Sequence, residues 1–475
     1  MRRNTAGPGL SREISRRSVI RAGAGLTAAT ALTLTASEIF APARAAAADN
    51  YDVIVVGAGY AGITAARELR LQGRRVLIVE ARDRIGGRTW TDTLAGKQIE
   101  MGGTWVETTQ PHVGAELTRY GIALVPDADP ERAFFPTPSG PAEFAPGEGF
   151  GLMGSVYERI FDGSQQYFER PFEPLHRLDL LKSLDKLSLR DRLDQMGLSR
   201  EQELMVNGQT AVYSGGSSAT GALTMLAQWW ALSGWNNDGW NETMKYRMST
   251  GTVGLLNAML NATQPTVVLN SPVSRIALSG TTYSVTTRSG TIFTAPAVVV
   301  AVPVNVWQTI TFSPALPAAH TTATSQGIGV KTGTKLWIHG RSSQGRFYAQ
   351  GAEGGSPITM LLPDKPTSTG QLYTAFSTDP SFDPTNFSRV TAAVKQLGAD
   401  MEVLAVKAQR WGSDPFARGG WAFRKPGQLT TLYPDLLKPS GRLAFASADM
   451  ANGWSGYIDG AIESGIRAAA QIAAA

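Results

Sequence analysis

The chain has 475 residues, and this length indicates two intertwined domains rather than one hydrophobic core. It has no cysteine and only four histidines (His112, His176, His320 and His339), which excludes disulfides and cysteine-ligated zinc and argues against any metal site. The net charge of +5 comes from residues 1–45: without their seven arginines and two glutamates, 37 basic and 37 acidic residues remain, which argues against nucleic-acid binding.

Residues 1–45 have the features of an export leader. The run Ser-Arg-Arg-Ser-Val-Ile, with Arg16 and Arg17, resembles a twin-arginine signal, and a mildly apolar stretch and a small-x-small site, Ala43-Arg44-Ala45, follow it. A membrane anchor is the less favoured alternative, because the apolar stretch is short and weakly apolar. The resemblance implies that the twin-arginine translocase exports the folded protein to a bacterial periplasm or beyond, with no stable membrane anchor.

The next segment, residues 51–80, has the pattern of a dinucleotide site. A run rich in β-branched residues, 51–56, predicts a buried strand, residues 60–72 predict a helix, and residues 75–79 predict a second strand. Three glycines between the first strand and the helix have G-x-G-x-x-G spacing: Gly57, Gly59 and Gly62.

Each residue of this pattern has a separate expected role. Gly57 allows a tight turn, Gly59 lets the backbone approach a pyrophosphate, and Gly62 lets the helix lie close to the strand. Glu80 lies 18 residues after Gly62, at the end of the second strand, where a carboxylate can accept both hydroxyls of an adenosine ribose. The same carboxylate would repel a 2′-phosphate, which argues against NADP.

A further glycine-rich turn follows Glu80. Two glycines and two arginines, among them Gly87 and Arg88, predict a second anion-binding turn that suits a long cofactor. The whole run, Glu-Ala-Arg-Asp-Arg-Ile-Gly-Gly-Arg-Thr at 80–89, resembles the flavin-containing amine oxidases, the family of monoamine oxidase, polyamine oxidase and L-amino-acid oxidase. The resemblance returns at intervals over most of the chain after about residue 50, and it implies FAD as the cofactor.

The resemblance also implies the fold, an α/β architecture with α+β elements in which a substrate-binding domain is inserted into a Rossmann-like FAD-binding domain. We expect the FAD-binding domain at 50–125, 245–325 and 413–475, and the substrate-binding domain at 126–245 and 326–412. Residues 126–150 are rich in proline and glycine and predict a linker, whereas 151–245 predict mainly helices.

Residues 445–461 resemble a second motif of the family, in which an acidic residue and the amides of the last helix hold the ribityl and pyrophosphate groups of the flavin. The matching acid is Asp449, whose reach is shorter than that of the usual glutamate; an ordinary solvated aspartate is the alternative. The resemblance implies this set of cofactor-binding residues: Gly57, Gly59, Ala61, Gly62, Glu80, Ala81, Arg82, Gly87, Arg88, Met101, Gly102, Gly103, Thr104, Val273, Asp449 and Ile458.

Three residues match catalytic positions of the family. Trp421 and Tyr457 match two aromatic rings that face each other before the flavin, and Lys335 matches a lysine that holds a water against it; Lys331 is the alternative lysine. The position of the flavin-linking cysteine of monoamine oxidase aligns with Gly420, so we expect noncovalent FAD.

The substrate is expected to be an amine without an α-carboxylate. L-amino-acid oxidases have an arginine shortly after the segment that contains Gly102 and Gly103, and none is present here. Glu107 and Gln110 are candidates for substrate contact, although Glu107 could equally be a surface carboxylate.

These features predict an FAD-dependent amine oxidase that converts a C–N bond to an imine, and then to an aldehyde or ketone, while O2 is reduced to H2O2. A periplasmic electron acceptor is an alternative to oxygen. A second interpretation is a dehydrogenase or desaturase of the same fold that acts on a non-amine, and a third is a flavin-binding partner protein without turnover. A homodimer is among the expected assemblies.

Overall fold

The first sheet is parallel, so the carboxyl ends of its strands all lie at the same edge. The structure, a computed structural model, describes residues 51–107 and 109–475, so the expected export leader lies outside the described residues. Five strands pair in parallel, in the order β20 (Leu443–Phe445), β13 (Ala297–Val300), β1 (Val53–Val56), β2 (Val76–Val79) and β9 (Thr266–Val268). Every residue of β1, β2, β13 and β20 is buried, as expected for a covered parallel sheet.

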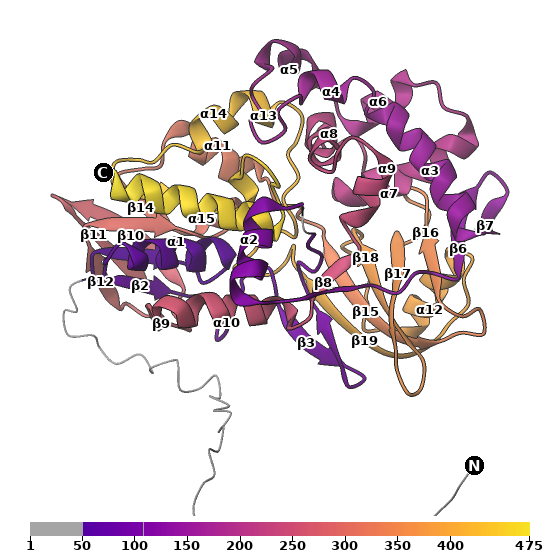
Figure 1. The fold of residues 1–475 in the computed structure, drawn as a ribbon, viewed down its shortest axis with the longest axis horizontal. Helices are drawn as coiled ribbons and strands as arrows, with labels where there is room; N and C mark the ends of the chain where they lie inside the picture. Colours follow the sequence, from indigo (N-terminus) through magenta and orange to yellow (C-terminus); the bar gives the residue numbers. More distant parts are fainter. Residues whose placement is uncertain (1–50, 108) are drawn as a thin grey trace, which may run out of the picture. The chain divides into compact units, whose positions relative to one another are not determined.

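Helices from both ends of the chain pack together beside this sheet. The contacting helices are α1 (Tyr60–Leu71), α15 (Ile458–Ala473), α10 (Gly251–Thr263) and α2 (Pro111–Tyr120). In Figure 1 the indigo α1 and the yellow α15 lie one above the other, so the first and last described helices are neighbours. The chain thus returns to its starting sheet in its last described segment.

A four-stranded sheet adjoins the first one and completes this side of the molecule. Its order is β12 (Ile292–Ala295), β11 (Thr282–Thr287), β10 (Val273–Ser279) and β14 (Thr311–Ser313). Two ribbons connect the segments, β3 (Thr91–Leu94) with β4 (Lys97–Glu100) and β5 (Leu124–Pro126) with β8 (Tyr246–Met248). The short helices here are η2 (Val304–Thr309), α11 (Ala318–Gln326), α13 (Gln428–Thr431), α14 (Tyr433–Leu436) and η3 (Ala448–Met450).

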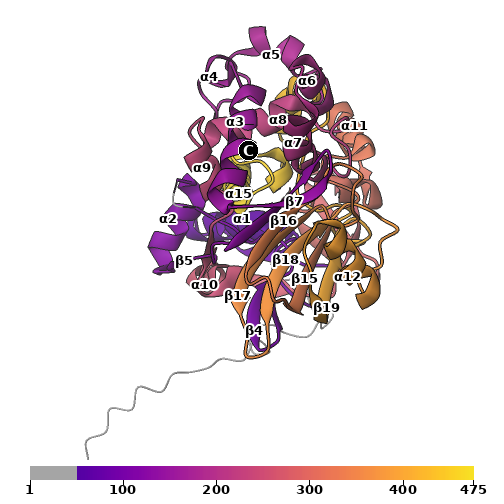
Figure 2. The ribbon, with the colours of Figure 1, turned by 90° about the vertical axis from the view of Figure 1, so that its right-hand side faces the viewer.

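A seven-stranded sheet and a group of helices form the other side (Figure 2). The strand order is β19 (Glu402–Arg410), β15 (Thr334–Arg341), β18 (Gln371–Ser377), β17 (Met360–Pro366), β16 (Phe347–Gln350), β6 (Arg132–Thr137) and β7 (Gly140–Phe144). The helices are α3 (Pro146–Ile160), α4 (Ser164–Tyr167), α5 (Leu178–Leu184), α6 (Leu189–Gln195), α7 (Arg200–Tyr213), α8 (Leu223–Leu232), α9 (Asn237–Glu242) and α12 (Phe387–Gln396). The predicted α/β class with α+β elements is confirmed.

The expectation of a linker at 126–150 is wrong. Residues 132–144 form the hairpin of β6 and β7, in which Pro136 pairs with Pro141. Proline is tolerated here because Pro141 lies in the edge strand β7, and Pro136 lies beyond the residues of β6 that pair with β16, Arg132–Phe134, so neither missing N–H breaks a ladder with an outer strand. A composition rich in proline and glycine therefore marks a sheet edge in this chain.

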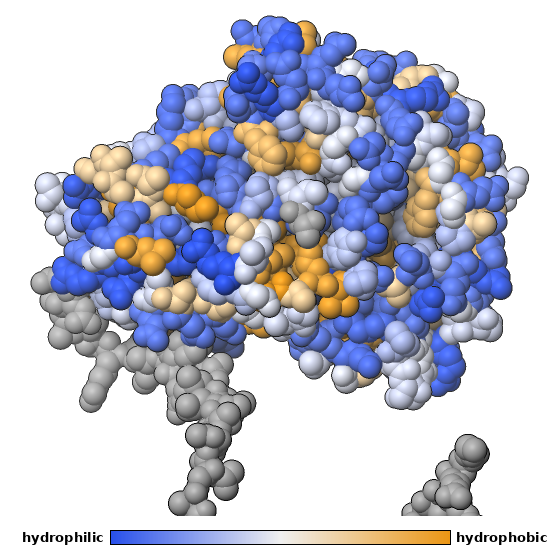
Figure 3. Space-filling view, in the orientation of Figure 1, coloured by the Kyte–Doolittle hydropathy of each residue, from blue (hydrophilic) through white to orange (hydrophobic). Residues whose placement is uncertain are grey.

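Within residues 51–107 and 109–475, no helix is both long enough and apolar enough to cross a membrane. On the face in Figure 3, hydrophilic residues cover most of the surface, and hydrophobic residues lie in small groups.

Gly62 sets the distance between α1 and the turn that precedes it. A Cβ at this position would lie 2.0 Å from the carbonyl oxygen of Gly57. We predict that Gly62→Ala lowers the free energy of unfolding by about 3 kcal/mol, because backbone atoms must move. Gly151→Ala, in α3 with open space around it, should instead stabilise the protein by about 0.5–1 kcal/mol. Urea unfolding of both variants measures the difference, and a tolerated Gly62→Ala would contradict the packing argument.

Candidate active site

A long cavity lies at the carboxyl edge of the parallel sheet and extends toward the seven-stranded sheet. The structure brings most of the predicted site residues into its wall: Gly57, Gly59, Ala61, Glu80, Ala81, Arg82, Gly87, Arg88, Gly102, Gly103, Thr104, Val273, Lys335, Trp421, Tyr457 and Ile458. Five of the predicted residues do not line it: Gly62, Met101, Glu107, Gln110 and Asp449.

One end of the cavity has the geometry of a dinucleotide cradle. Gly57 has φ of 108°, which favours glycine, and the turn leads into α1. The N-terminus of α1 has no side-chain cap and no acidic residue in its first turn, so its N–H groups remain available to an anion. The Glu80 carboxylate accepts hydrogen bonds from the amides of Ala58 (2.7 Å) and Arg82 (2.8 Å), which hold it in place.

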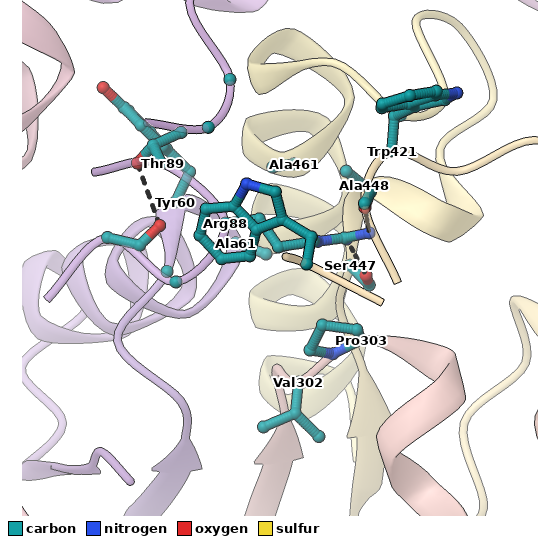
Figure 4. A pocket seen from close by; sticks show the side chains of 18 of the residues that line it. Tyr60, Ala61, Arg88, Thr89, Val302, Pro303, Trp421, Ser447, Ala448 and Ala461 are labelled. Atoms are coloured by element: carbon teal, nitrogen blue, oxygen red, sulfur yellow. Dashed lines mark hydrogen bonds between the residues drawn. The ribbon is translucent and has the colours of Figure 1, made fainter. Parts of the chain in front are cut away.

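Arg88 links this end to the last segment of the chain. Its Nη1 lies 2.6 Å from Oδ1 of Asp449 and donates to the carbonyl of Gly420 (3.0 Å). Its Nη2 donates to Oγ of Ser447 (3.3 Å), a contact that Figure 4 shows as a dashed line. Asp449 is fully buried, and its Oδ2 accepts from the amide of Val304 (2.9 Å). It therefore lies behind the wall and positions Arg88.

Gly102 and Gly103 serve two different purposes. A Cβ on Gly102 would lie 1.9 Å from the carbonyl oxygen of Arg88, so this glycine permits two chain segments to approach each other. Gly103 has no such conflict, since its nearest neighbour would be Cγ2 of Thr89 at 3.2 Å. At Gly102 the missing side chain thus serves the contact of the chain with itself. Met101 is buried nearby, and its carbonyl accepts from Nε1 of Trp411 (2.9 Å).

Lys335, rather than Lys331, faces the cavity. Lys331 is exposed, whereas Lys335 is 3% exposed and lines the wall from β15. Its Nζ donates to the carbonyl of Gly102 (2.9 Å) and to Oγ1 of Thr104. The sequence left the choice between the two lysines open, and the exposure of Lys331 decides which of them reaches the cavity.

Aromatic rings surround the Lys335 ammonium. Nζ lies 5.1 Å from the ring centre of Trp105, 5.6 Å from that of Trp337 and 5.8 Å from that of Phe376. Burial, together with the nearby positive charge of Arg247, lowers the pKa of Lys335 from 10.5 to about 7, although Glu100, Asp127 and Asp364 oppose the shift. Its charge therefore changes in the neutral pH range.

The far end of the cavity is an aromatic chamber. Trp421 donates from Nε1 to the carbonyl of Tyr213 (2.9 Å), and its ring packs edge-to-face against Phe376 (6.0 Å). The Tyr457 ring packs edge-to-face against Trp229 (5.1 Å, 89°). These contacts hold both predicted cage rings in place on the cavity wall.

The sequence did not single out several residues of this chamber: Trp105, Val212, Tyr213, Trp229, Thr243, Met244, Met360 and Phe376. Trp229 lies in α8, whose ten residues are all buried, so no amphipathic pattern distinguishes the position that faces the cavity. The available signal in the sequence was the number of aromatic residues in the predicted helical segment 151–245.

Glu107 and Gln110 lie outside the cavity wall, and Glu107 is close enough to Tyr457 to add to the rise that burial causes in the pKa of that phenol. Both are buried, and Oε1 of Glu107 and Nε2 of Gln110 have no hydrogen-bond partner among the described residues. Burial, with the nearby charges of Glu242 and Asp459, raises the pKa of Glu107 to about 7. Their predicted contact with substrate stays a prediction.

The wall residues fit FAD. A glycine turn, an uncapped helix N-terminus, a held carboxylate and Arg88 at one end suit an adenosine diphosphate, and the aromatic chamber at the other end suits a flat ring with an amine before it. No group of three or more metal-binding side chains is found in the part of the chain that the structure describes. A long cofactor would contact three parts of the chain: the one around Gly57 and Glu80, the one around Val273 and Pro303, and the one that contains Ser447 and Ile458.

We predict that the buried ammonium of Lys335 makes stability depend on pH. The unfolded chain keeps this proton up to about pH 10.5 and the native protein loses it near 7, so the free energy of unfolding should rise with pH in this window. The slope for one group is at most about 1.4 kcal/mol per pH unit. Urea unfolding of Lys335→Met from pH 7 to 10 should lack this rise, whereas the control Lys331→Met should keep it. Equal slopes in both variants would contradict the burial argument.

Comparisons with known proteins agree with this geometry. The family of flavin-containing amine oxidoreductases matches residues 60–473. A pseudooxynicotine dehydrogenase of Pseudomonas sp. is 36% identical over 431 residues, which cover 89% of this chain and 86% of that protein. An (S)-6-hydroxynicotine oxidase of Paenarthrobacter nicotinovorans is 32% identical over 431 residues, which cover 87% of this chain and 97% of that protein.

The same fold occurs in a solved structure of lower identity. Wild-type putrescine oxidase bound to putrescine has a TM-score of 0.76 and 23% identity, over 90% of this chain and 100% of that chain. The length of the family match and the identity of the two relatives assign the family, and with it the cofactor FAD. The chain therefore belongs to the flavin-containing amine oxidoreductases and is an FAD-dependent enzyme that acts on amines.

Proposed function

We propose that this enzyme oxidises the C–N bond of a primary or secondary monoamine with an apolar body. One observation carries the proposal. Glu80, at the dinucleotide end, is the sole carboxylate among the described residues that line the cavity, while rings and methionines form the chamber. A second ammonium group or an α-carboxylate on the substrate would find no partner of opposite charge among the rings.

The amine gives up two electrons and two protons and becomes an imine, which water hydrolyses to an aldehyde or ketone and the released amine or ammonia. FAD, when bound, supplies the two-electron acceptor. Trp421 and Tyr457 orient the neutral amine and exclude water from the chamber. Of the three donors of the Lys335 ammonium, Gly102 and Thr104 occupy two, so the third can hold a water or favour negative charge that develops on oxygen.

Oxygen is the proposed electron acceptor, with two electrons and two protons yielding H2O2. The positive charge of Lys335 in the chamber supports this choice of acceptor, because it favours the negative charge that develops on oxygen as oxygen is reduced. A protein acceptor is the second candidate, because one relative is named a dehydrogenase and another an oxidase. Measuring H2O2 formed per amine consumed in air distinguishes the two, since an oxidase yields one for each.

The aromatic chamber should determine substrate preference. We predict that Trp421→Ala lowers kcat/KM for apolar monoamines by roughly tenfold, because a ring contact of the bound amine is lost. Trp421→Phe keeps a ring and should lose less. Anaerobic mixing with monoamines and matched diamines, followed by the flavin absorbance, measures the reduction; faster reduction by diamines would contradict a chamber without carboxylates.

The export of the folded, flavin-loaded protein remains a proposal that rests on the leader sequence, as does its periplasmic or secreted location. We predict that changing Arg16 and Arg17 together to lysine stops export and leaves active enzyme in the cytoplasm. Activity in cell fractions measures this, with Arg2 and Arg3 changed to lysine as the control. Continued export of the first variant would show a different route.

A further inference from the structure

A short loop spans the length of the cavity between its two ends. The loop runs from Trp411 to Gly420, and the amide of Gly419 donates to the carbonyl of Trp411 (3.0 Å), which closes it. The amides of Trp411 and Gly420 donate to the carbonyls of Gly333 (3.1 Å) and Val330 (2.9 Å). Both ends of the loop are therefore anchored to the segment that leads into β15.

The tip of the loop lies at the dinucleotide end of the cavity, beside Arg82 and Glu80. Oδ1 of Asp414 lies 2.5 Å from Nη2 of Arg82, whose own amide donates to the Glu80 carboxylate. The same Asp414 oxygen accepts from the amide of Phe416 (2.9 Å). One carboxylate thus fixes both the arginine and the aromatic residue of the tip.

The Phe416 ring is in contact with two guanidinium groups. The Cζ atoms of Arg82 and of Arg288, which follows β11, are each 5.4 Å from the ring centre. All three side chains line the cavity. Asp414 neutralises Arg82, whereas Arg288 forms no ion pair with any described carboxylate. The ring therefore joins three chain segments through contacts that a modest motion of the tip would break.

We propose that Phe416, Arg82, Arg288 and Asp414 form a clamp over the adenosine end of FAD, and that opening of the clamp limits the release of the cofactor. A purine is flat and polarisable, and both a guanidinium and a phenyl ring bind such a face. With no cysteine in the chain to hold the flavin, retention depends on noncovalent contacts of this kind. The inference concerns cofactor retention and does not depend on which amine is the substrate.

The test is the rate at which the purified holoenzyme releases FAD after dilution, followed by the fluorescence of the free flavin. Phe416→Ala should release FAD about tenfold faster, because it loses both ring–guanidinium contacts. Phe416→Leu should give an intermediate rate, since it keeps apolar contact without the ring. Asp414→Asn should also release FAD faster, because Arg82 loses its charged partner.

Phe387→Ala is the matched control, a phenylalanine that is exposed on α12 and outside the cavity wall. It should release FAD at the wild-type rate. At saturating FAD, Phe416→Ala should recover the wild-type kcat, which distinguishes faster release from damage to the chamber. A wild-type release rate in Phe416→Ala, or equal acceleration in Phe387→Ala, would overturn the clamp.

Discussion

The site depends on the ion pair between Arg88, which is partly exposed to the cavity, and the fully buried Asp449. It joins residues from the first and last segments of the chain, and the second oxygen of Asp449 holds Val304 at the start of η2, in the middle segment. Removing one partner of such a pair leaves an uncompensated buried charge, which typically costs about 3–5 kcal/mol. Three segments that are distant in sequence thus meet at one carboxylate, and the cavity wall forms around that point.

The two ends of the cavity use opposite physical strategies. Backbone amides, a held carboxylate and arginines form the dinucleotide end, where a charged ligand can replace water. The aromatic chamber has Lys335 as its charged group, and its ammonium is kept in an apolar setting by two hydrogen bonds and three rings. A charge with few water contacts acts strongly on a reacting group, and burial also shifts its pKa. The dinucleotide end of the wall therefore serves cofactor binding, whereas Lys335 at the other end serves the reaction.

Local patterns in the sequence predicted the parts of the site that depend on neighbours in the chain. The glycine turn, Glu80 and Arg88 lie where expected, because strand, turn and helix are set over about thirty residues. The position of Trp229 or Phe416 in the wall depends on packing between distant segments, which no local pattern records. The linker predicted at 126–150 was wrong for a related reason. The two prolines of the β6–β7 hairpin fit an edge strand, and only the pairing with neighbouring strands shows that β7 is at the edge. Glu107 is adjacent in sequence to the wall and still lies outside it.

The place of β20 beside β13 has a consequence for biosynthesis. Ser447, Ala448, Tyr457 and Ile458 line the same cavity as Glu80, so a nascent chain cannot complete the cofactor site until these residues have left the ribosome. Until then β13 lacks its neighbour on one side, and an unpaired strand edge invites association with other chains. Contacts between residues so far apart in sequence also form slowly. FAD can therefore make its full set of contacts only after the last cavity-lining segment has been synthesised and has folded against β13.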